Sequence, residues 1–526
     1  MVPKNRALAI TKSKVICLVS MSIFFTQEPV LAIDFKFAPS LTVQETYSDN
    51  IRLATKGNEQ GAFVTEITPG LSIRSFNGGR VNANFDYRMQ NLFNAGGEGD
   101  TQIFHQLNFN SGYEVSRNKL FVNARSSFNQ QDTTNLRGGD NINNLETRTN
   151  IWTAGSSAIW TPHFGSFADA IVNIDFDYVG NDSAERLTNS MNLRESVLIR
   201  SGLAFSRVTW NIAFENSTEY RQNDDDVQFQ SGNATLRSWL DRTFNVFTTL
   251  GYANNDFDSL DDDSNGFYYT VGAQWRPTWY FDIEAGYGSN WHVSSNISLS
   301  KRTRFNIGYF DRSIGLNTGG AWNASLNHYT RMSTWRFSYS EDTTSVQSIL
   351  LEDTPFSIVG IDGNPILGND GNPLIFNASV PTLTDDVLTR QTADFSVSYR
   401  TGKSNVQMGG FYEKRAYDQS DNNQETVYGV NASWNWEFIR RSSVLFSPSW
   451  QRIKRNNITA TGFDLADIED DRYQFTTRLT HVMPLTIGRS SVVNLSLEYS
   501  FLKQNSTLEL NSYVENRVVA SIFMSF

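Results

Sequence analysis

The chain has 526 residues, of which 39% are hydrophobic and 13% are aromatic, and its formal net charge is −11. Such an acidic chain lacks the basic surface that nucleic-acid binding requires, so a nucleic-acid partner is excluded. After residue 32, no segment has the roughly 18 continuous apolar residues that identify a membrane-spanning helix.

Residues 1–32 have the three zones of a secretory signal peptide. Basic residues precede an apolar run from Val15 to Phe25, and the small residues up to Ala32 form a cleavage site. We therefore expect a cleaved signal peptide and export of residues 33–526. Cys17, the only cysteine, lies in the apolar run, so the mature chain has no disulfide and no thiolate metal site.

Apolar and polar residues alternate with a period of two along most of the remaining chain. The alternation is clearest in residues 80–90, 168–178, 208–214, 335–339 and 493–501. These segments are about ten to fifteen residues long, which exceeds the usual strand of a β-sandwich and is enough to cross a bilayer at a tilt. The pattern predicts membrane-spanning strands.

Short turns alternate with longer polar loops between these segments. The predicted turns are 76–79, 116–119, 162–166, 276–277, 300–302, 401–404 and 487–490, and the predicted loops are 48–61, 131–145, 180–187, 256–265, 313–319, 347–390 and 456–470. Barrels of Gram-negative bacteria have this asymmetry of periplasmic turns and extracellular loops. We predict an all-β fold: a transmembrane antiparallel up-and-down β-barrel of the bacterial outer-membrane type, with about 24 strands (roughly 22–26) and a single domain over residues 33–526.

The chain ends on a strand pattern in which Ile522, Met524 and Phe526 share one face. A terminal aromatic residue after alternating apolar residues is similar to the signal that the barrel assembly machinery recognises in the bacterial outer membrane. The last strand must also close against the first, because an open sheet edge is not stable in lipid. We therefore expect the assembly machinery, outer-membrane lipid and lipopolysaccharide as partners.

Four segments resemble the outer-membrane β-barrel proteins associated with the PEP-CTERM/exosortase system. They are "LTVQETYSDNIRLA" (41–54), "EITPGLSIRS" (66–75), "RTRFNIGYFDRS" (302–313) and "TWRFSYSEDTTS" (334–345). The resemblance extends along the whole barrel and implies a link to exopolysaccharide production, but it supplies no set of functional residues.

The longest predicted loop, 347–390, contains the tandem turns "DGNPI" and "DGNPL", with Asp362, Asn364, Asp370 and Asn372 at the turn positions. Its many apolar residues are unusual for a loop in water. We expect either a constriction loop that folds into the lumen or an extracellular hairpin that packs on its neighbours.

Arginine is the dominant basic residue, and ten arginines occupy polar strand positions that predict a luminal location. They are Arg80, Arg88, Arg125, Arg194, Arg200, Arg237, Arg304, Arg336, Arg400 and Arg478. Guanidinium groups bind carboxylates bidentately, so these residues either line a path for an anionic saccharide or pair with acidic residues and stiffen the barrel. We favour the second interpretation, with Asp86, Asp175, Asp177, Glu215 and Glu498 as the acidic partners.

Neither a metal site nor an active site is predicted. Asp261, Asp263 and Asn265 begin a calcium-loop pattern, but Gly272 occupies the position at which a bidentate glutamate is needed. The histidines are scattered, and no nucleophile or zinc-protease motif is present. We expect no enzymatic activity and no cofactor.

Two functions remain open. The first is a porin-like channel or export component linked to exopolysaccharide and the PEP-CTERM system, with polysaccharide as the solute. The second is a structural or surface-binding barrel that anchors extracellular matrix or a partner complex without conducting. A continuous luminal arginine track would favour the first, and a lumen closed by ion pairs and a plug would favour the second.

Overall fold

The fold comes from a computed structural model. It describes residues 34–76, 79–94, 101–132, 141–143, 148–182, 187–222, 224–257, 264–351, 387–417, 424–456, 458–460, 463–465, 467–484 and 492–526. The predicted signal peptide, the turn 487–490, the residues Asp261 and Asp263, and the turn positions Asp362, Asn364, Asp370 and Asn372 lie outside these ranges.

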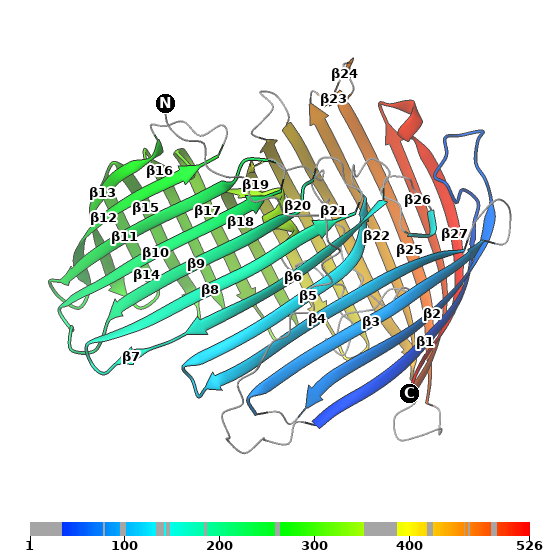
Figure 1. Ribbon diagram of the computed structural model, residues 1–526, viewed down its shortest axis with the longest axis horizontal. Coiled ribbons are helices and arrows are strands. Elements are labelled where there is room, and N and C mark those ends of the chain that lie inside the picture. Colours follow the sequence, from blue (N-terminus) through cyan, green and yellow to red (C-terminus); the bar gives the residue numbers. More distant parts are fainter. Residues whose placement is uncertain are drawn as a thin grey trace, which may run out of the picture.

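Twenty-four long strands form one antiparallel wall (Figure 1). The sheet contains 25 strands, of which the two-residue β7 (His163–Phe164) is an addition beside β8. The strands of the wall are β1 (Asp34–Ser48), β2 (Ala62–Phe76), β3 (Val81–Asn94), β4 (Gln102–Ser116), β5 (Leu120–Asp132), β6 (Arg148–Trp160), β8 (Ala168–Asn181), β9 (Ser190–Ser201), β10 (Val208–Arg221), β11 (Val227–Trp239), β12 (Phe244–Asp256), β13 (Gly266–Thr278), β14 (Phe281–Gly288), β15 (Asn290–Ser300), β16 (Thr303–Arg312), β17 (Gly319–Tyr329), β18 (Ser333–Ser345), β19 (Val387–Arg400), β20 (Ser404–Tyr417), β21 (Gln424–Ile439), β22 (Ser442–Asn456), β25 (Ile468–Pro484), β26 (Val492–Ser506) and β27 (Tyr513–Ser525). The predicted strand number is confirmed.

The wall closes between its first and last strands. β1 pairs with β2 on one side and with β27 on the other, where Val43 lies opposite Ile522. The Phe526 amide donates to the Pro39 carbonyl at 3.0 Å and extends this seam to the end of the chain. Every strand of the wall therefore has two neighbours, and no edge is left to be satisfied by lipid.

Successive side chains point alternately to the outer surface and to the lumen. On β27, Val518 and Ile522 are each 43% exposed on the outer face, whereas Val519 and Ser521 are buried on the luminal face. Exposed aromatic and aliphatic side chains recur at the outward positions of the other strands. An apolar belt around a closed barrel with a polar interior matches the outer membrane of a bacterium, and the chain is an outer-membrane β-barrel.

One predicted turn is wrong. Residues 276–277 lie inside β13, and the chain reverses at Trp279 and Tyr280 instead. The register shifts between Trp275 and Thr278, which allows for Pro277, because proline has no amide to donate to the ladder. Pro277 is common in turns, but in this structure it lies at a β-bulge within β13.

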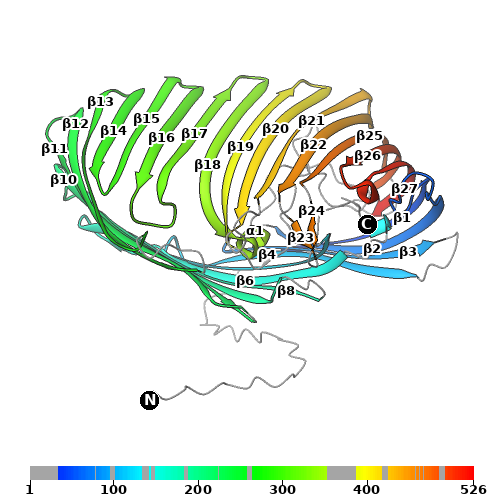
Figure 2. The same ribbon diagram turned by 90° about the horizontal axis from the view of Figure 1, so that it is seen from above.

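The two ends of the barrel differ. The chain enters β1 and leaves β27 at the end that carries the short turns, which we take as the periplasmic end (Figure 1). The other end carries the 3-10 turn η3 (Glu509–Asn511) and a hairpin of β23 (Ile458–Ala460) and β24 (Phe463–Leu465). Seen from above, the ring is elongated, and the short helix α1 (Val346–Leu351) lies inside it (Figure 2). None of the described helices is long and apolar enough to cross a membrane.

Candidate functional site in the lumen

The strand register places the predicted arginines on the luminal face. The face opposite the exposed apolar belt is luminal, and residue pairing carries this assignment from strand to strand. Arg80 directly precedes β3, and the other nine occupy luminal positions of their strands: Arg88, Arg125, Arg194, Arg200, Arg237, Arg304, Arg336, Arg400 and Arg478.

Three of these arginines hold carboxylates. The Nη2 of Arg125 lies 2.6 Å from Asp177 and 3.5 Å from Asp175, and Arg478 lies 2.5 Å from Glu498. The Asp177 carboxylate occupies the space where Gly155, on the strand between β5 and β8, lacks a side chain.

The third arginine, Arg237, contacts Glu284 at 2.9 Å and also donates to Asn245 and Gln274. Such bidentate or multiply bonded pairs fix neighbouring strands to one another. This part of the lumen matches the ion-pair interpretation.

Other acidic and basic residues that we expected to form ion pairs do not form them. Asp86 and Glu215 form no ion pair within the described part of the chain. The same holds for six arginines, whose side chains meet no described carboxylate: Arg80, Arg194, Arg200, Arg304, Arg336 and Arg400. The lumen therefore combines paired and unpaired guanidinium groups.

A buried charge network that sequence reasoning missed joins β20, β21, β22 and β25 near the extracellular end. Arg415 is 1% exposed and binds Glu413 at 2.8 Å and Glu425 at 2.7 Å. Arg455 lies 3.3 Å from Glu425 and 2.6 Å from Asp470. The sequence contains part of the information that predicts this network, because its charged residues occupy polar, luminal positions in strands with a clear alternating pattern.

A second buried cluster surrounds the 3-10 turn η1 (Asn141–Asn143), which belongs to the predicted loop 131–145. Asn143 is fully buried and contacts Arg517 at 3.0 Å and Glu515 at 3.2 Å. The adjacent Ile142 packs with Val64 and Leu92 on the luminal face of β2 and β3. Asn141–Asn143, the described part of a loop expected at the surface, thus lies in the lumen and covers the luminal side of β2 and β3 there.

Helix α1 connects opposite parts of the wall. It follows β18 directly, yet it contacts β8, which lies on the far arc of the ring (Figure 2). The Ser345 hydroxyl donates to Glu219 on β10 at 2.5 Å, and Asn192 on β9 donates to Ser348 at 3.4 Å. The start of the predicted loop 347–390 therefore lies within the lumen.

Apolar packing supports the bridge that α1 forms. Val346 is fully buried in a cluster with Ile151 and Val179 from one arc and Leu388 and Tyr417 from the other. Further apolar residues of the helix pack against this cluster: Ile349, Leu350 and Leu351. At this level α1 therefore packs between two arcs of the wall.

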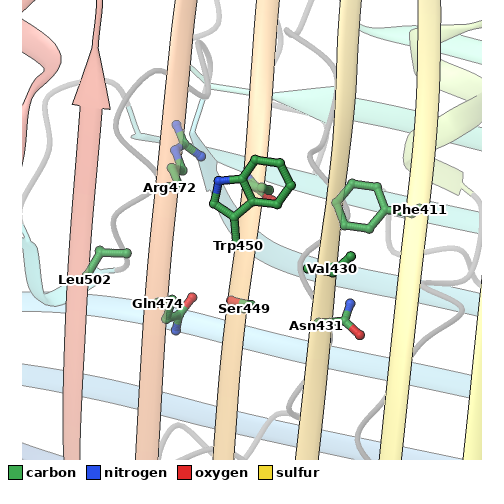
Figure 3. Close-up of a pocket in the computed structure, with 9 residues that line it drawn as sticks. Phe411, Val430, Asn431, Ser449, Trp450, Arg472, Gln474 and Leu502 are labelled. Atoms are coloured by element: carbon green, nitrogen blue, oxygen red, sulfur yellow. The ribbon is translucent and has the colours of Figure 1, made fainter.

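A small recess lies between β20, β21, β22, β25 and β26 (Figure 3). Phe411, Trp450 and Leu502 contribute apolar surface, and Arg472 and Gln474 contribute polar groups. Its volume is about 40 Å³, which is enough for a water molecule but not for a sugar ring. The recess is therefore not a ligand site for a saccharide.

Asn265 is the one residue of the calcium pattern that the structure describes. Asn265 bonds across the β12–β13 connection, where it accepts from the Asn255 amide at 2.8 Å and donates to its carbonyl. Among the residues that the structure describes, no three metal-ligating side chains come together.

The sequence matches no protein-family model and no curated protein. Among solved structures, the chain is similar to the FrpB iron transporter from Neisseria meningitidis (F3-3 variant), with 10% identity, a TM-score of 0.47, and coverage of 94% of this chain and 82% of that chain. It is also similar to the siderophore receptor PirA from Pseudomonas aeruginosa, with 10% identity, a TM-score of 0.41, and coverage of 93% and 80%. These similarities are too low to carry an inference about a ligand.

Proposed function

We propose that the protein is a porin-like outer-membrane channel for anionic solutes, with acidic exopolysaccharide as the solute class. The observation that carries this proposal is the luminal face of β16–β19, which stays exposed beside the α1 bridge. Asn306, Arg304 and Arg336 are exposed there, whereas many luminal side chains at the extracellular ends of β20, β21, β22, β25, β26 and β27 are buried. A polar, water-accessible face in a closed barrel is the feature that channels of this class use for conduction.

The charge of that face favours anions. Cationic side chains that line a pore raise the local concentration of anionic solutes, because the low-dielectric wall focuses their field. The resemblance to the PEP-CTERM-associated barrels supports a saccharide as the solute, the arginines favour an acidic one, and the outer membrane is where such a polymer has to cross.

Swelling of proteoliposomes tests the channel function. Liposomes that contain the folded protein should swell in an isotonic solution of a uronic acid faster than empty liposomes, and faster than in a neutral sugar of similar size. The reason is that the solute enters through the exposed luminal face and is attracted by its arginines. Swelling no faster than in empty liposomes, for either sugar, would contradict the proposal.

A structural barrel is the second candidate, because specific contacts favour it. The Arg415 network ties the neighbouring strands β20, β21, β22 and β25 together, Arg517 holds η1 on β27, and α1 links opposite arcs of the wall. A barrel that only anchors surface material needs a rigid wall of this kind, but it does not need an open path for solutes through the lumen. A swelling assay without solute entry, from protein that is otherwise folded, would favour this function.

A further inference from the structure

Short polar side chains dominate the exposed luminal face of β16–β19. Apart from three arginines and Tyr329, most side chains of its lower half are amides and hydroxyls. We name this surface the serine–asparagine wall, and it comprises Arg304, Asn306, Asn323, Ser325, Asn327, Arg336, Ser338, Ser396, Ser398 and Arg400. Each residue occupies a luminal position of its strand by the register.

The three arginines are arranged in a fixed pattern. Arg304 pairs with Asn327, and Asn327 pairs in turn with Arg336, so the three residues form one row across β16, β17 and β18. Because neighbouring strands are about 4.8 Å apart, the two arginine backbones are separated by about 10 Å. Arg400 lies four residues below Ser396, the residue opposite Arg336, which corresponds to about 13 Å along the strand.

The guanidinium groups of the wall are available to a ligand. All three side chains are exposed, and none forms an ion pair or hydrogen bond with a described side chain. Two luminal carboxylates adjoin the wall by the register: Asp394, opposite Ser338 at the upper edge, and Asp282, which lies in the row of Asn306 two strands away. Neither forms an ion pair with the three arginines, so the wall has three cationic groups and two anionic neighbours.

The location of the wall defines the side from which a ligand arrives. Arg304 is the second residue of β16, Arg336 is the fourth residue of β18, and Arg400 ends β19. These positions adjoin the short turns, so the arginines line one side of the periplasmic mouth. Tyr329, at a luminal position at the end of β17, is 44% exposed beside them and offers an aromatic ring for stacking.

We propose that the serine–asparagine wall binds an acidic saccharide chain at the periplasmic mouth of the lumen. Arginine binds carboxylates bidentately, and amide and hydroxyl groups can both donate to and accept from sugar hydroxyls. Two arginines about 10 Å apart can hold successive acidic groups of one polymer, while the short side chains between them leave room for the sugar rings. The inference rests on the proposed channel function and specifies its substrate and its first binding site.

Calorimetric titration of the detergent-solubilised, folded barrel tests the inference. The probe is a galacturonic acid hexamer, and a maltose-type neutral hexamer is the comparison. The acidic hexamer should bind, with an affinity that falls as salt is raised, and the triple variant Arg304→Gln, Arg336→Gln, Arg400→Gln should bind at least about tenfold more weakly. Heat-dependent gel mobility verifies that each variant is folded.

The matched control carries the same charge change on turns of the same barrel end: Arg302→Gln, Arg331→Gln, Arg440→Gln. This control should keep the affinity of the unmodified protein. Equal weakening in both triple variants, binding of the neutral hexamer with equal affinity, or no binding of the acidic hexamer would overturn the inference. Binding without proteoliposome swelling would instead remove the channel function and leave the binding site intact, so the two failures are distinguishable.

Discussion

The variant Arg415→Met is expected to lower the free energy of unfolding of the barrel by about 3–5 kcal/mol. Methionine retains much of the side-chain volume but leaves the carboxylates of Glu413 and Glu425 without the guanidinium that binds them at 2.8 and 2.7 Å. Glu425 is 3% exposed, so water cannot replace the lost partner. The measurement is guanidinium chloride unfolding of the refolded protein in detergent.

Two further variants identify the cause. The double variant Arg415→Met, Glu425→Gln should recover part of the loss, because residue 425 then no longer carries a buried negative charge whose remaining basic partner is Arg455 at 3.3 Å. Arg452→Met removes an arginine that pairs with Asp471 at 2.6 Å on the outer face and should change the unfolding midpoint little. If the Arg415→Met barrel is as stable as the unmodified protein, Arg415 does not stabilise the buried carboxylates in the way described.

The second large effect is expected from the apolar face of α1. The triple variant Ile349→Ser, Leu350→Ser, Leu351→Ser should raise the single-channel conductance by roughly twofold or more, because the bridge that narrows the lumen is released. Each substitution removes apolar contact with the Val346 cluster, and because these side chains are only partly buried, each loss is smaller than the roughly 1.5–3 kcal/mol of a fully buried side chain. Planar-bilayer recording of the purified variant measures the change.

The conservative triple variant Ile349→Leu, Leu350→Met, Leu351→Met is the control for this effect. It keeps the helix apolar and should leave the conductance near that of the unmodified protein. A serine variant that folds normally and conducts like this control would mean that α1 does not limit the path.

The strands of the barrel wall are predictable from the sequence, because the side that each side chain faces depends only on its position within its own strand. Alternation with a period of two determines which side chains face lipid, and this placed Arg125 and Arg336 on the correct face before any pairing was known. Pro277 shows the limit of the approach, since the same residue is compatible with a turn and with a bulge.

The contents of the lumen are much less predictable. The network around Arg415 needs the register of four strands, and its members extend over 57 positions, from Glu413 to Asp470. The inward folding of Asn143 and Val346 depends on contacts with strands from distant parts of the chain. The periodicity of a sequence carries no information about such contacts. For this reason, the sequence is compatible with both a surface hairpin and a constriction loop in the segment after β18.

The single-channel conductance of the unmodified, refolded protein in a planar bilayer tests the central claim most directly. We predict a stable, anion-selective pore whose current is blocked by a soluble acidic polysaccharide added at the periplasmic side, and much less by a neutral polysaccharide of the same length. A folded barrel that inserts into the bilayer and carries no current, with or without polysaccharide, would contradict the account.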